Sequence, residues 1–530
     1  MSGEGEFARA CREIASVLAS IPSPEPGVVE EVKRRVAGKY GLARMPTNAD
    51  ILAHADAQLR DRLRRVLLKK PVRSISGIVI VAIMTYPFEC PHGRCLYCPH
   101  VPGAPTSYTG KEPSARRGID SGFDPVVQIR RRLAQLEALG HAVDKVDLII
   151  QGGTFTAAPL EYREWFMLGV LEALIGFRPR SFEEGELYAE RSRYRLVGLT
   201  FETRPDQCSE EQIDWMLSRG ATRVELGVQT IYDDVYEFVA RGHGVREVVE
   251  ATRRLKDAAL KVTYHIMPGL PLTNMKLDYQ VFEKVFGSSH FMPDHLKIYP
   301  TLVLEHTGLY SLWRRGAYRP LGTGECVELI SAVKENLLPK FVRVMRVNRD
   351  IPSTEIVAGV DRTNLRQYVH QHMRGRGLRC RCIRCREAGH ARLRGVEARG
   401  FEITVEKFYA NEGIEYFIAA EDVERDVLIG FLRLRRPSRK AWRPEITSAE
   451  SFLVRELHVY GRAVPIGGRD EESWQHRGVG EALLAKAEEI ADTEGGSKVL
   501  VMSGIGVREY YYRLGYRREG PYVSKLLSRR

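Results

Sequence analysis

The hydrophobic pattern of residues 76–345 alternates between two periods. Short runs rich in β-branched residues are separated by longer stretches in which apolar residues recur every three or four positions. The short runs predict buried strands and the longer stretches predict amphipathic helices. The predicted strands are Gly77–Thr85, Val146–Gln151, Leu196–Glu202, Arg223–Gln229, Val262–Met267 and Leu296–Tyr299. The predicted helices between them are Pro125–Leu139, Glu161–Ile175, Glu210–Ser218, Val245–Ala259 and Leu277–Phe286. This series of six β-α units favours a parallel sheet, either open or curled into a partial barrel.

The pattern changes on both sides of this region. Residues 1–75 have helical spacing, with predicted helices at Phe7–Ala19, at Val28–Ala37 and from Ile51 to about Lys70. From about residue 400 the pattern is that of an antiparallel α/β domain, with predicted strands at Phe401–Phe408, Ile414–Ala420, Val427–Leu434, Ser451–Tyr460 and Lys498–Met502 and a helix at Glu481–Ala491. We therefore expect four regions: a basic helical N-terminal region at 1–75, an α/β domain at 76–345, a basic linker at 346–399 and a second α/β domain at 400–530.

The charge of the chain suggests a class of partner. Lys and Arg exceed Asp and Glu to give a net charge of +12 over 530 residues, which favours nucleic acid over a merely basic surface. The stretch Arg60–Arg73 carries seven Lys or Arg residues and one acid, so it is either a solvated helix face or a contact for a phosphate backbone. The longest apolar run is too short to span a bilayer, and the N-terminus does not resemble a signal peptide. We expect a soluble, cytoplasmic protein without a membrane partner.

Three cysteines directly follow the first predicted strand. Cys90, Cys95 and Cys98 are separated by four and then two residues. Three thiolates on one tight loop can hold three irons of a [4Fe-4S] cluster and leave the fourth iron open to a chelating ligand, such as the amino-carboxylate end of S-adenosylmethionine. The alternative is a structural zinc loop with His92 or His100 as its fourth ligand. The clustering of cysteines argues against a secreted disulfide framework.

Polar residues end the other predicted strands. They are Gln151 to Thr154, Glu202 to Arg204, Glu225 with Gln229, His265, and Lys297 with Tyr299. Any one of them could be an ordinary satisfied polar group. Because the carboxyl ends of parallel strands meet at one edge of a sheet, together they predict a ligand site at the same mouth as the cysteine loop.

A second cysteine group lies in the basic linker. Cys380, Cys382 and Cys385 offer three thiolates within six residues. A zinc ion would need one more ligand, and His390 is nearest in the sequence, with His370, His372 and the more distant His458 as alternatives. We expect a structural zinc that pins a basic hinge between two domains, rather than three free thiols.

A Q-x-x-G-x-G motif, Gln475–Gly480, leads into the predicted helix of the second α/β domain. Bare backbone N–H groups at the positive end of a helix suit a pyrophosphate. The motif lies between the strand that ends at Tyr460 and the strand Lys498–Met502, and the tyrosine-rich segment Tyr510–Tyr516 follows.

These motifs carry a family resemblance. Residues 76–345 resemble a radical S-adenosylmethionine domain, and residues 400–530 resemble a GNAT acetyltransferase. In this order, with the segments Arg455–Gly461 and Leu296–Thr301, they resemble the family of the Elongator catalytic subunit. The resemblance implies a partial (β/α)6 barrel followed by a GNAT domain. It also implies a radical enzyme that converts wobble uridine 34, in the anticodon stem-loop of tRNA, to 5-carboxymethyluridine with the acetyl group of acetyl-CoA. Archaeal and bacterial members act as single chains, which implies that other Elongator subunits are not required.

The resemblance also implies roles for individual residues. Cys90, Cys95 and Cys98 would bind the cluster. The residues expected around S-adenosylmethionine are Gly152, Gly153, Thr154, Glu202, Arg204 and Gln229. The residues expected to contact acetyl-CoA are Lys145, Glu456, Leu457, His458, Val459, Val479, Gly480, Glu481 and Tyr511. Lys297 and Tyr299 match positions near the reacting groups. Tyr511 would protonate the departing CoA thiolate or position a water, unless it is a core aromatic.

Two departures from the family pattern and two other functions remain. Four residues separate Cys90 from Cys95 (x4), whereas three (x3) is the commonest spacing in radical S-adenosylmethionine domains and eukaryotic members have a longer gap. The linker cysteines are absent from eukaryotic members, so the zinc assignment there depends mainly on spacing. A protein lysine acetyltransferase with a scaffold barrel is the main alternative function. A non-catalytic tRNA-binding module would leave both ligand sites unexplained.

Overall fold

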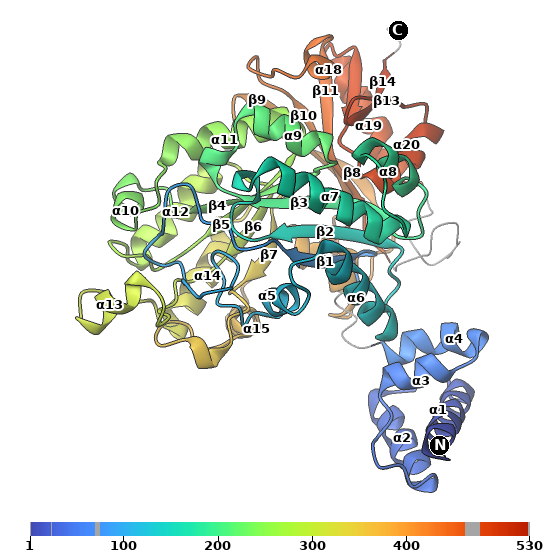
Figure 1. Ribbon diagram of the computed structural model, residues 1–530. Helices are drawn as coiled ribbons and strands as arrows, with labels where there is room; N and C mark the ends of the chain where they lie inside the picture. Colours follow the sequence, from blue (N-terminus) through green and yellow to red (C-terminus); the bar gives the residue numbers. More distant parts are fainter. Residues whose placement is uncertain (1, 23, 69–74, 462–477, 528–530) are drawn as a thin grey trace.

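The computed structural model describes residues 2–22, 24–68, 75–461 and 478–527 of the chain. Figure 1 shows a helical module at the N-terminus that stands apart from a larger body with two sheets. The module consists of α1 (Ser2–Ser20), α2 (Pro26–Lys39), α3 (Asn48–His54) and α4 (Ala57–Leu67), and α3 contacts α6 of the larger body.

The prediction of one helix from Ile51 to about Lys70 was wrong, because the chain breaks between α3 and α4. Ala55 is extended, with φ −75° and ψ 143°. The break lets Ile51 and Leu52 on one side, and Leu63 and Leu67 on the other, all enter the core of the module. Burial of apolar side chains thus outweighs the helix propensity of the continuous stretch.

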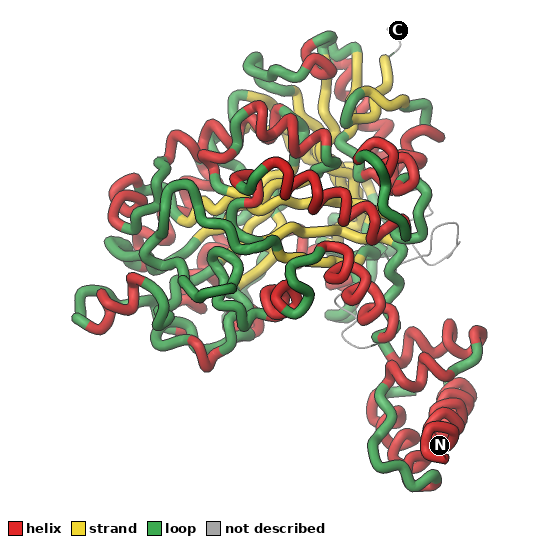
Figure 2. The backbone as a smooth tube through the Cα atoms, in the orientation of Figure 1, coloured by secondary structure: helices red, strands yellow, loops and turns green. Residues whose placement is uncertain are grey.

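The larger body begins with a sheet of seven parallel strands in sequence order, which confirms the partial barrel. Its strands are β1 (Val79–Met84), β2 (Lys145–Gln151), β3 (Arg195–Thr203), β4 (Arg223–Gln229), β5 (Lys261–Ile266), β6 (His295–Ile298) and β7 (Arg343–Val347). The seventh strand extends the six predicted units. Helices surround the strands (Figure 2): α5 (Pro113–Ile119), α6 (Pro125–Ala138), α7 (Leu160–Ile175), α8 (Phe182–Ala189), α9 (Glu210–Ser218), α10 (Asp233–Phe238), α11 (Val245–Asp257), α12 (Met275–Gly287), α13 (Gly308–Arg314), α14 (Thr323–Asn336) and α15 (Leu365–Gly375).

The second sheet has the order β13-β14-β12-β11-β10-β9-β8 and is mainly antiparallel, with β11 and β12 parallel. Its strands are β8 (Glu402–Ala410), β9 (Gly413–Asp422), β10 (Val427–Arg436), β11 (Ser451–Val459), β12 (Lys498–Val501), β13 (Arg517–Glu519) and β14 (Tyr522–Leu526). The associated helices are α18 (Pro444–Thr447), α19 (Val479–Thr493) and α20 (Arg508–Arg513). The linker forms α16 (Ile383–Arg386) and α17 (Ala388–Arg392). None of the described helices is long and apolar enough to cross a membrane.

The second sheet packs against the amino ends of the barrel strands through buried ion pairs. Arg455 of β11 donates to Asp294, which precedes β6, at 2.6 and 2.8 Å, and to Glu415 at 2.9 Å. Arg435 of β10 donates to Asp257 of α11 at 2.7 Å. These contacts join the two sheets into one body, and they leave the carboxyl ends of the barrel strands on the opposite side.

Candidate functional site

A cavity of about 370 Å³ lies at the carboxyl ends of the barrel strands. The three cysteines of the loop after β1 line it. So do most of the residues predicted at the strand ends: Gln151, Gly153, Thr154, Glu202, Arg204, Gln229, His265 and Tyr299. The structure therefore brings together, at one mouth, side chains that the sequence placed on separate strands.

The cysteine loop accommodates its x4 gap with a tight turn. Gly93 has φ +87°, a left-handed conformation that favours glycine, and its N–H donates to the Cys90 carbonyl at 3.0 Å. The Cys90 and Cys98 sulfurs lie 3.5 and 3.4 Å from the hydroxyls of Thr154 and Ser107. A hydrogen bond between Cys95 and Cys98 lowers the pKa of Cys95 and raises that of Cys98, so that one of the two is held as a thiolate. A thiolate is the form that iron requires.

The donor set and the backbone fit a cluster with a bound S-adenosylmethionine. A β-carbon on Gly152 would clash with the Thr85 hydroxyl, and Gly153 has φ +85°, so a ligand can approach this backbone closely. Gln151 Oε1 and Gln229 Oε1 are buried without a hydrogen-bond partner among the described residues. Unpaired acceptors beside three thiols suit a ligand that carries an ammonium group and ribose hydroxyls.

Glu202 is held by Gln151, which the sequence placed at the same mouth, and by Tyr108, which it did not suggest. Its carboxylate accepts from the Tyr108 hydroxyl at 3.0 Å and from Gln151 Nε2 at 3.3 Å. The Arg349 guanidinium lies 5.5 Å from the Tyr108 ring centroid. Tyr108 sits in an irregular loop, where spacing offers no signal. Arg204 does not contact Glu202; it donates to His92 of the cysteine loop at 2.8 Å and to Asp206 at 2.9 Å.

Glu225, which lines the cavity, contacts two other side chains. His265 Nε2 lies 3.0 Å from a Glu225 oxygen, and the Lys297 ammonium bonds to the same oxygen. Burial would raise the pKa of Glu225, but Lys297 and His265 hold it far below its usual range. Burial would lower the pKa of Lys297, but Glu225 raises it instead. Both groups are therefore charged at neutral pH. The Tyr299 ring lies edge-on to His265, with centroids 5.3 Å apart.

Most of the residues predicted for acetyl-CoA lie on β11 and at the start of α19. Leu457 and Val459 pack toward the core that contains α19, whereas the side chains of Glu456 and His458 face the barrel. Any contact of Glu456 and His458 with acetyl-CoA would therefore use their backbone. A β-carbon on Gly480 would lie 2.7 Å from the Tyr510 hydroxyl, which brings Tyr510 to the start of α19. Gln475 of the predicted motif lies outside the described residues, and the described part begins at Gly478.

Tyr511 is packed inside the second domain. Its ring lies 5.1 Å from that of Tyr510 and 5.9 Å from that of Tyr516, and burial raises its pKa well above the usual value. The family resemblance singled out Tyr511, although nothing in the local sequence separates it from Tyr510 within one run of tyrosines. Of the two, Tyr510 has its hydroxyl near Gly480.

The two predicted ligand sites lie at opposite ends of the barrel. Lys145 begins β2, and its partner in the sheet, Arg195, lies 3.6 Å from Glu509 of α20, so Lys145 is on the side of the second domain. Polar side chains point into the barrel between the two ends; they include Asp147, Thr200, Arg223, Glu225, Thr263 and His295. At the end of the barrel that faces the second domain, His295 lies 3.6 Å from Glu456 of β11.

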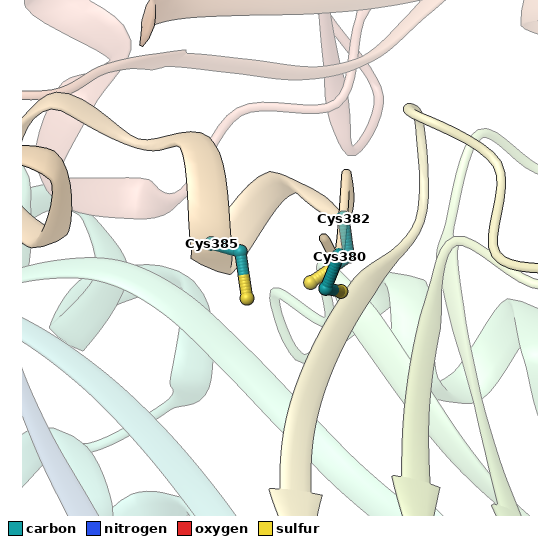
Figure 3. Close-up of side chains that lie close together, drawn as sticks. All are labelled: Cys380, Cys382 and Cys385. Atoms are coloured by element: carbon teal, nitrogen blue, oxygen red, sulfur yellow. The ribbon is translucent and has the colours of Figure 1, made fainter. Parts of the chain in front are cut away.

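The linker cysteines come together as the spacing predicted. The sulfurs of Cys380, Cys382 and Cys385 lie within 4.8 Å of one another (Figure 3). Lys334 of α14 donates to Cys380 Sγ at 3.1 Å. Of the histidines considered, His390 lies 3.2 Å from Glu387 and His458 lies 3.4 Å from the Ser76 carbonyl. His370 Nε2 is buried without a partner among the described residues, and burial with nearby Lys334 lowers its pKa to about 4. His390 Nε2 likewise has no hydrogen-bond partner among the described residues, and burial lowers the pKa of His390 to about 4, so both histidines are neutral candidate ligands.

We expect about one zinc ion per chain in the purified protein, because three converging thiols are typical of structural zinc sites. Cys382→Ala should lose this zinc. Elemental analysis by mass spectrometry measures it, and Cys208→Ala is the matched control, since Cys208 is equally buried but lies outside the group. Zinc below about one tenth per chain in the unaltered protein would contradict the assignment.

Family models match nearly the whole chain. They are the ELP3 N-terminal domain at residues 7–75, the Radical SAM superfamily at residues 86–278, the Radical_SAM C-terminal domain at residues 293–375 and the acetyltransferase (GNAT) family at residues 393–516.

Individual relatives agree with these matches. A tRNA uridine(34) acetyltransferase of Methanocaldococcus jannaschii is 47% identical over 493 residues, which cover 91% of each chain. Elongator complex protein 3 of Schizosaccharomyces pombe is 43% identical over 535 residues, which cover 98% of each chain. Among solved structures, the archaeal Methanocaldococcus infernus Elp3 with N-terminus deletion (1-46) has a TM-score of 0.76 and 44% identity, covering 86% of this chain and 100% of that one.

Proposed function

The chain belongs to the family of the archaeal tRNA uridine(34) acetyltransferases and Elongator complex protein 3, and from this premise we propose that it forms 5-carboxymethyluridine at position 34 of tRNA from acetyl-CoA. The observation that carries the proposal is the cavity, where three cysteines face Gly153, Glu202 and Gln229. A scaffold barrel in a protein acetyltransferase would have no use for this arrangement. A tRNA partner would place the activity in the cytoplasm.

The cysteine loop would hold the cluster, and Gly152, Gly153, Thr154, Glu202 and Gln229 would surround S-adenosylmethionine. When bound, these groups supply a radical able to take hydrogen from an unactivated methyl group. The protein binds and orients the reactants and excludes water. Lys297, charged and fixed by Glu225, can hold an oxygen of the acetyl group or of the uracil, and Tyr299 and His265 lie beside it.

The second domain would bind acetyl-CoA. The N-terminus of α19 at Val479 to Glu481 offers backbone N–H groups to the pyrophosphate, and the backbone of β11 from Glu456 to Val459 can pair with the pantetheine arm. Lys145, at the same end of the barrel, can reach a CoA phosphate. Tyr510 joins Tyr511 as a hydroxyl that could protonate the CoA thiolate, because its oxygen lies next to Gly480.

The proposal is tested by reconstitution of the purified single chain under anaerobic conditions. With reductant, tRNA, S-adenosylmethionine and acetyl-CoA, it should form 5-carboxymethyluridine without other Elongator subunits. Omission of tRNA, of S-adenosylmethionine or of acetyl-CoA should abolish formation of the modified uridine. Acetyl-lysine formed without tRNA, with no modified uridine, would favour a protein acetyltransferase instead.

The N-terminal module would bind the tRNA backbone through α4. Arg62 is exposed, whereas Arg60 donates to the Ala55 carbonyl at the end of α3 at 3.0 Å and so helps hold the module together. The triple variant Arg62→Gln, Arg64→Gln, Arg65→Gln should weaken tRNA binding and lower the slope of log K against log salt by about 2. Fluorescence anisotropy at several salt concentrations measures both. Lys39→Gln, which removes an exposed cation paired with Glu13, is the control, and an equal slope in both variants would place α4 away from the tRNA.

A further inference from the structure

A short segment far along the chain packs directly on the cysteine loop. We define the clamp segment as Val239–His243, between α10 and α11. The Leu96 N–H, inside the cysteine loop, donates to the Val239 carbonyl at 3.0 Å. Arg241 Nη1 donates to Cys95 Sγ at 3.7 Å, across 146 positions of sequence. A β-carbon on Gly242, which has φ +73°, would lie 2.6 Å from the β-carbon of His92.

The guanidinium of Arg241 lies against Gly227, where the absence of a side chain leaves room for it. Arg241 Nη2 donates to the Gly227 carbonyl of β4 at 2.5 Å. A β-carbon on Gly227 would lie 2.6 Å from that same nitrogen, so a larger residue on β4 would displace the arginine. Arg241 is only 6% exposed, and its Nε also lacks a partner among the described residues.

The charge of Arg241 is directed at the cysteines. In the part of the chain that the structure describes, no carboxylate forms an ion pair with Arg241, whereas Arg204, which contacts His92, is paired with Asp206. The buried cation therefore faces Cys95 without a neutralising acid. A positive charge and an N–H donor beside a cluster sulfur stabilise the more negative, one-electron-reduced form of an iron–sulfur cluster more than its oxidised form.

We propose that Arg241 is a positioning residue that holds the Cys95 thiolate and raises the reduction potential of the cluster bound by the cysteine loop. The inference rests on the cluster assignment of the proposed function. It explains why an arginine is buried here without an acid, and why Gly227 and Gly242 flank it. It also gives the x4 gap a structural partner, because His92, within that gap, packs against Gly242.

The test is a redox titration of the anaerobically reconstituted protein, in which electron paramagnetic resonance follows the reduced cluster. We expect Arg241→Gln to shift the midpoint potential to more negative values, and Arg241→Lys, which keeps the charge but not the planar fork, to lie between it and the unaltered protein. Arg94→Gln is the matched control. Arg94 belongs to the same loop, is 60% exposed and pairs with Glu89 at 3.7 Å, so its removal should leave the potential unchanged.

The iron content separates this inference from the proposed function. If the unaltered protein binds no iron–sulfur cluster, the cluster assignment itself is wrong. If it binds the cluster and Arg241→Gln has the same midpoint potential, only the role of Arg241 is overturned. Should Arg241→Gln fail to assemble a cluster, Arg241→Lys decides: a more negative potential supports the proposal and an unchanged potential overturns it.

Discussion

Replacement of Cys95 with alanine is expected to abolish uridine 34 modification, with a loss of more than about 10³-fold. Cys95 is the middle cysteine of the loop and the most buried of the three, and its sulfur contacts both His92 and Arg241. Two remaining thiols cannot hold a cluster with one open iron, so the radical source is lost. Mass spectrometry of the tRNA nucleosides measures the rate of uridine modification, and iron analysis measures the cluster content.

The control for this variant is Cys326→Ala. Cys326 lies in α14, in the same domain, and is as buried as Cys95, but it does not line the cavity. Cys326→Ala should keep its iron and most of its activity, and Cys95→Ala should still bind tRNA. Unchanged modification by Cys95→Ala would contradict the radical assignment.

Asp294→Ala is expected to lower the free energy of unfolding by about 3–5 kcal/mol, because it leaves buried cations without a partner. Asp294 accepts from Nη1 and Nη2 of Arg455, at 2.8 and 2.6 Å, and lies 3.6 Å from Arg433. Nearby cations, Arg455 first, hold the pKa of Asp294 far below its usual range against the opposing effect of burial. The residue is therefore an anion of the barrel domain that pairs with two arginines of the second sheet. Urea denaturation followed by circular dichroism measures the loss.

An exposed ion pair of the second domain provides the comparison. Glu412 and Lys440 pair at 2.8 Å with both side chains about half exposed, so Glu412→Ala should cost less than about 1 kcal/mol. If Asp294→Ala costs no more than Glu412→Ala, the buried ion pairs do not hold the two sheets together.

The candidate cavity was predictable because it follows from the period of the strands. Residues two apart on a strand share a face, so Glu202, His265 and Tyr299 could be expected at one mouth once each strand was recognised. Lys297 was expected at the same mouth, and its ammonium lies beside Glu225, which lines the cavity. The convergence of the linker cysteines was likewise local, since three thiols within six residues have little freedom to diverge.

The rest depended on contacts between distant segments. Tyr108 and Arg241 reach Glu202 and Cys95 across 94 and 146 positions, and neither has a recognisable spacing. The break at Ala55 was missed because the pattern of α3 and α4 is continuous, and only the packing onto α1 requires a turn there. Glu456 and His458 were expected to contact acetyl-CoA, but the alternation of side chains along the strand turns theirs toward the barrel. There Glu456 contacts His295, and His458 contacts the Ser76 carbonyl.

The most direct test of the proposed function follows the acetyl carbon. The reconstituted chain receives tRNA, reductant, S-adenosylmethionine and acetyl-CoA labelled with carbon-13 in its methyl group, and the tRNA nucleosides and the protein are then analysed by mass spectrometry. The proposed function predicts one labelled carbon in 5-carboxymethyluridine at position 34, dependent on Cys95. Label found only in acetyl-lysine, formed equally well without tRNA, would contradict it.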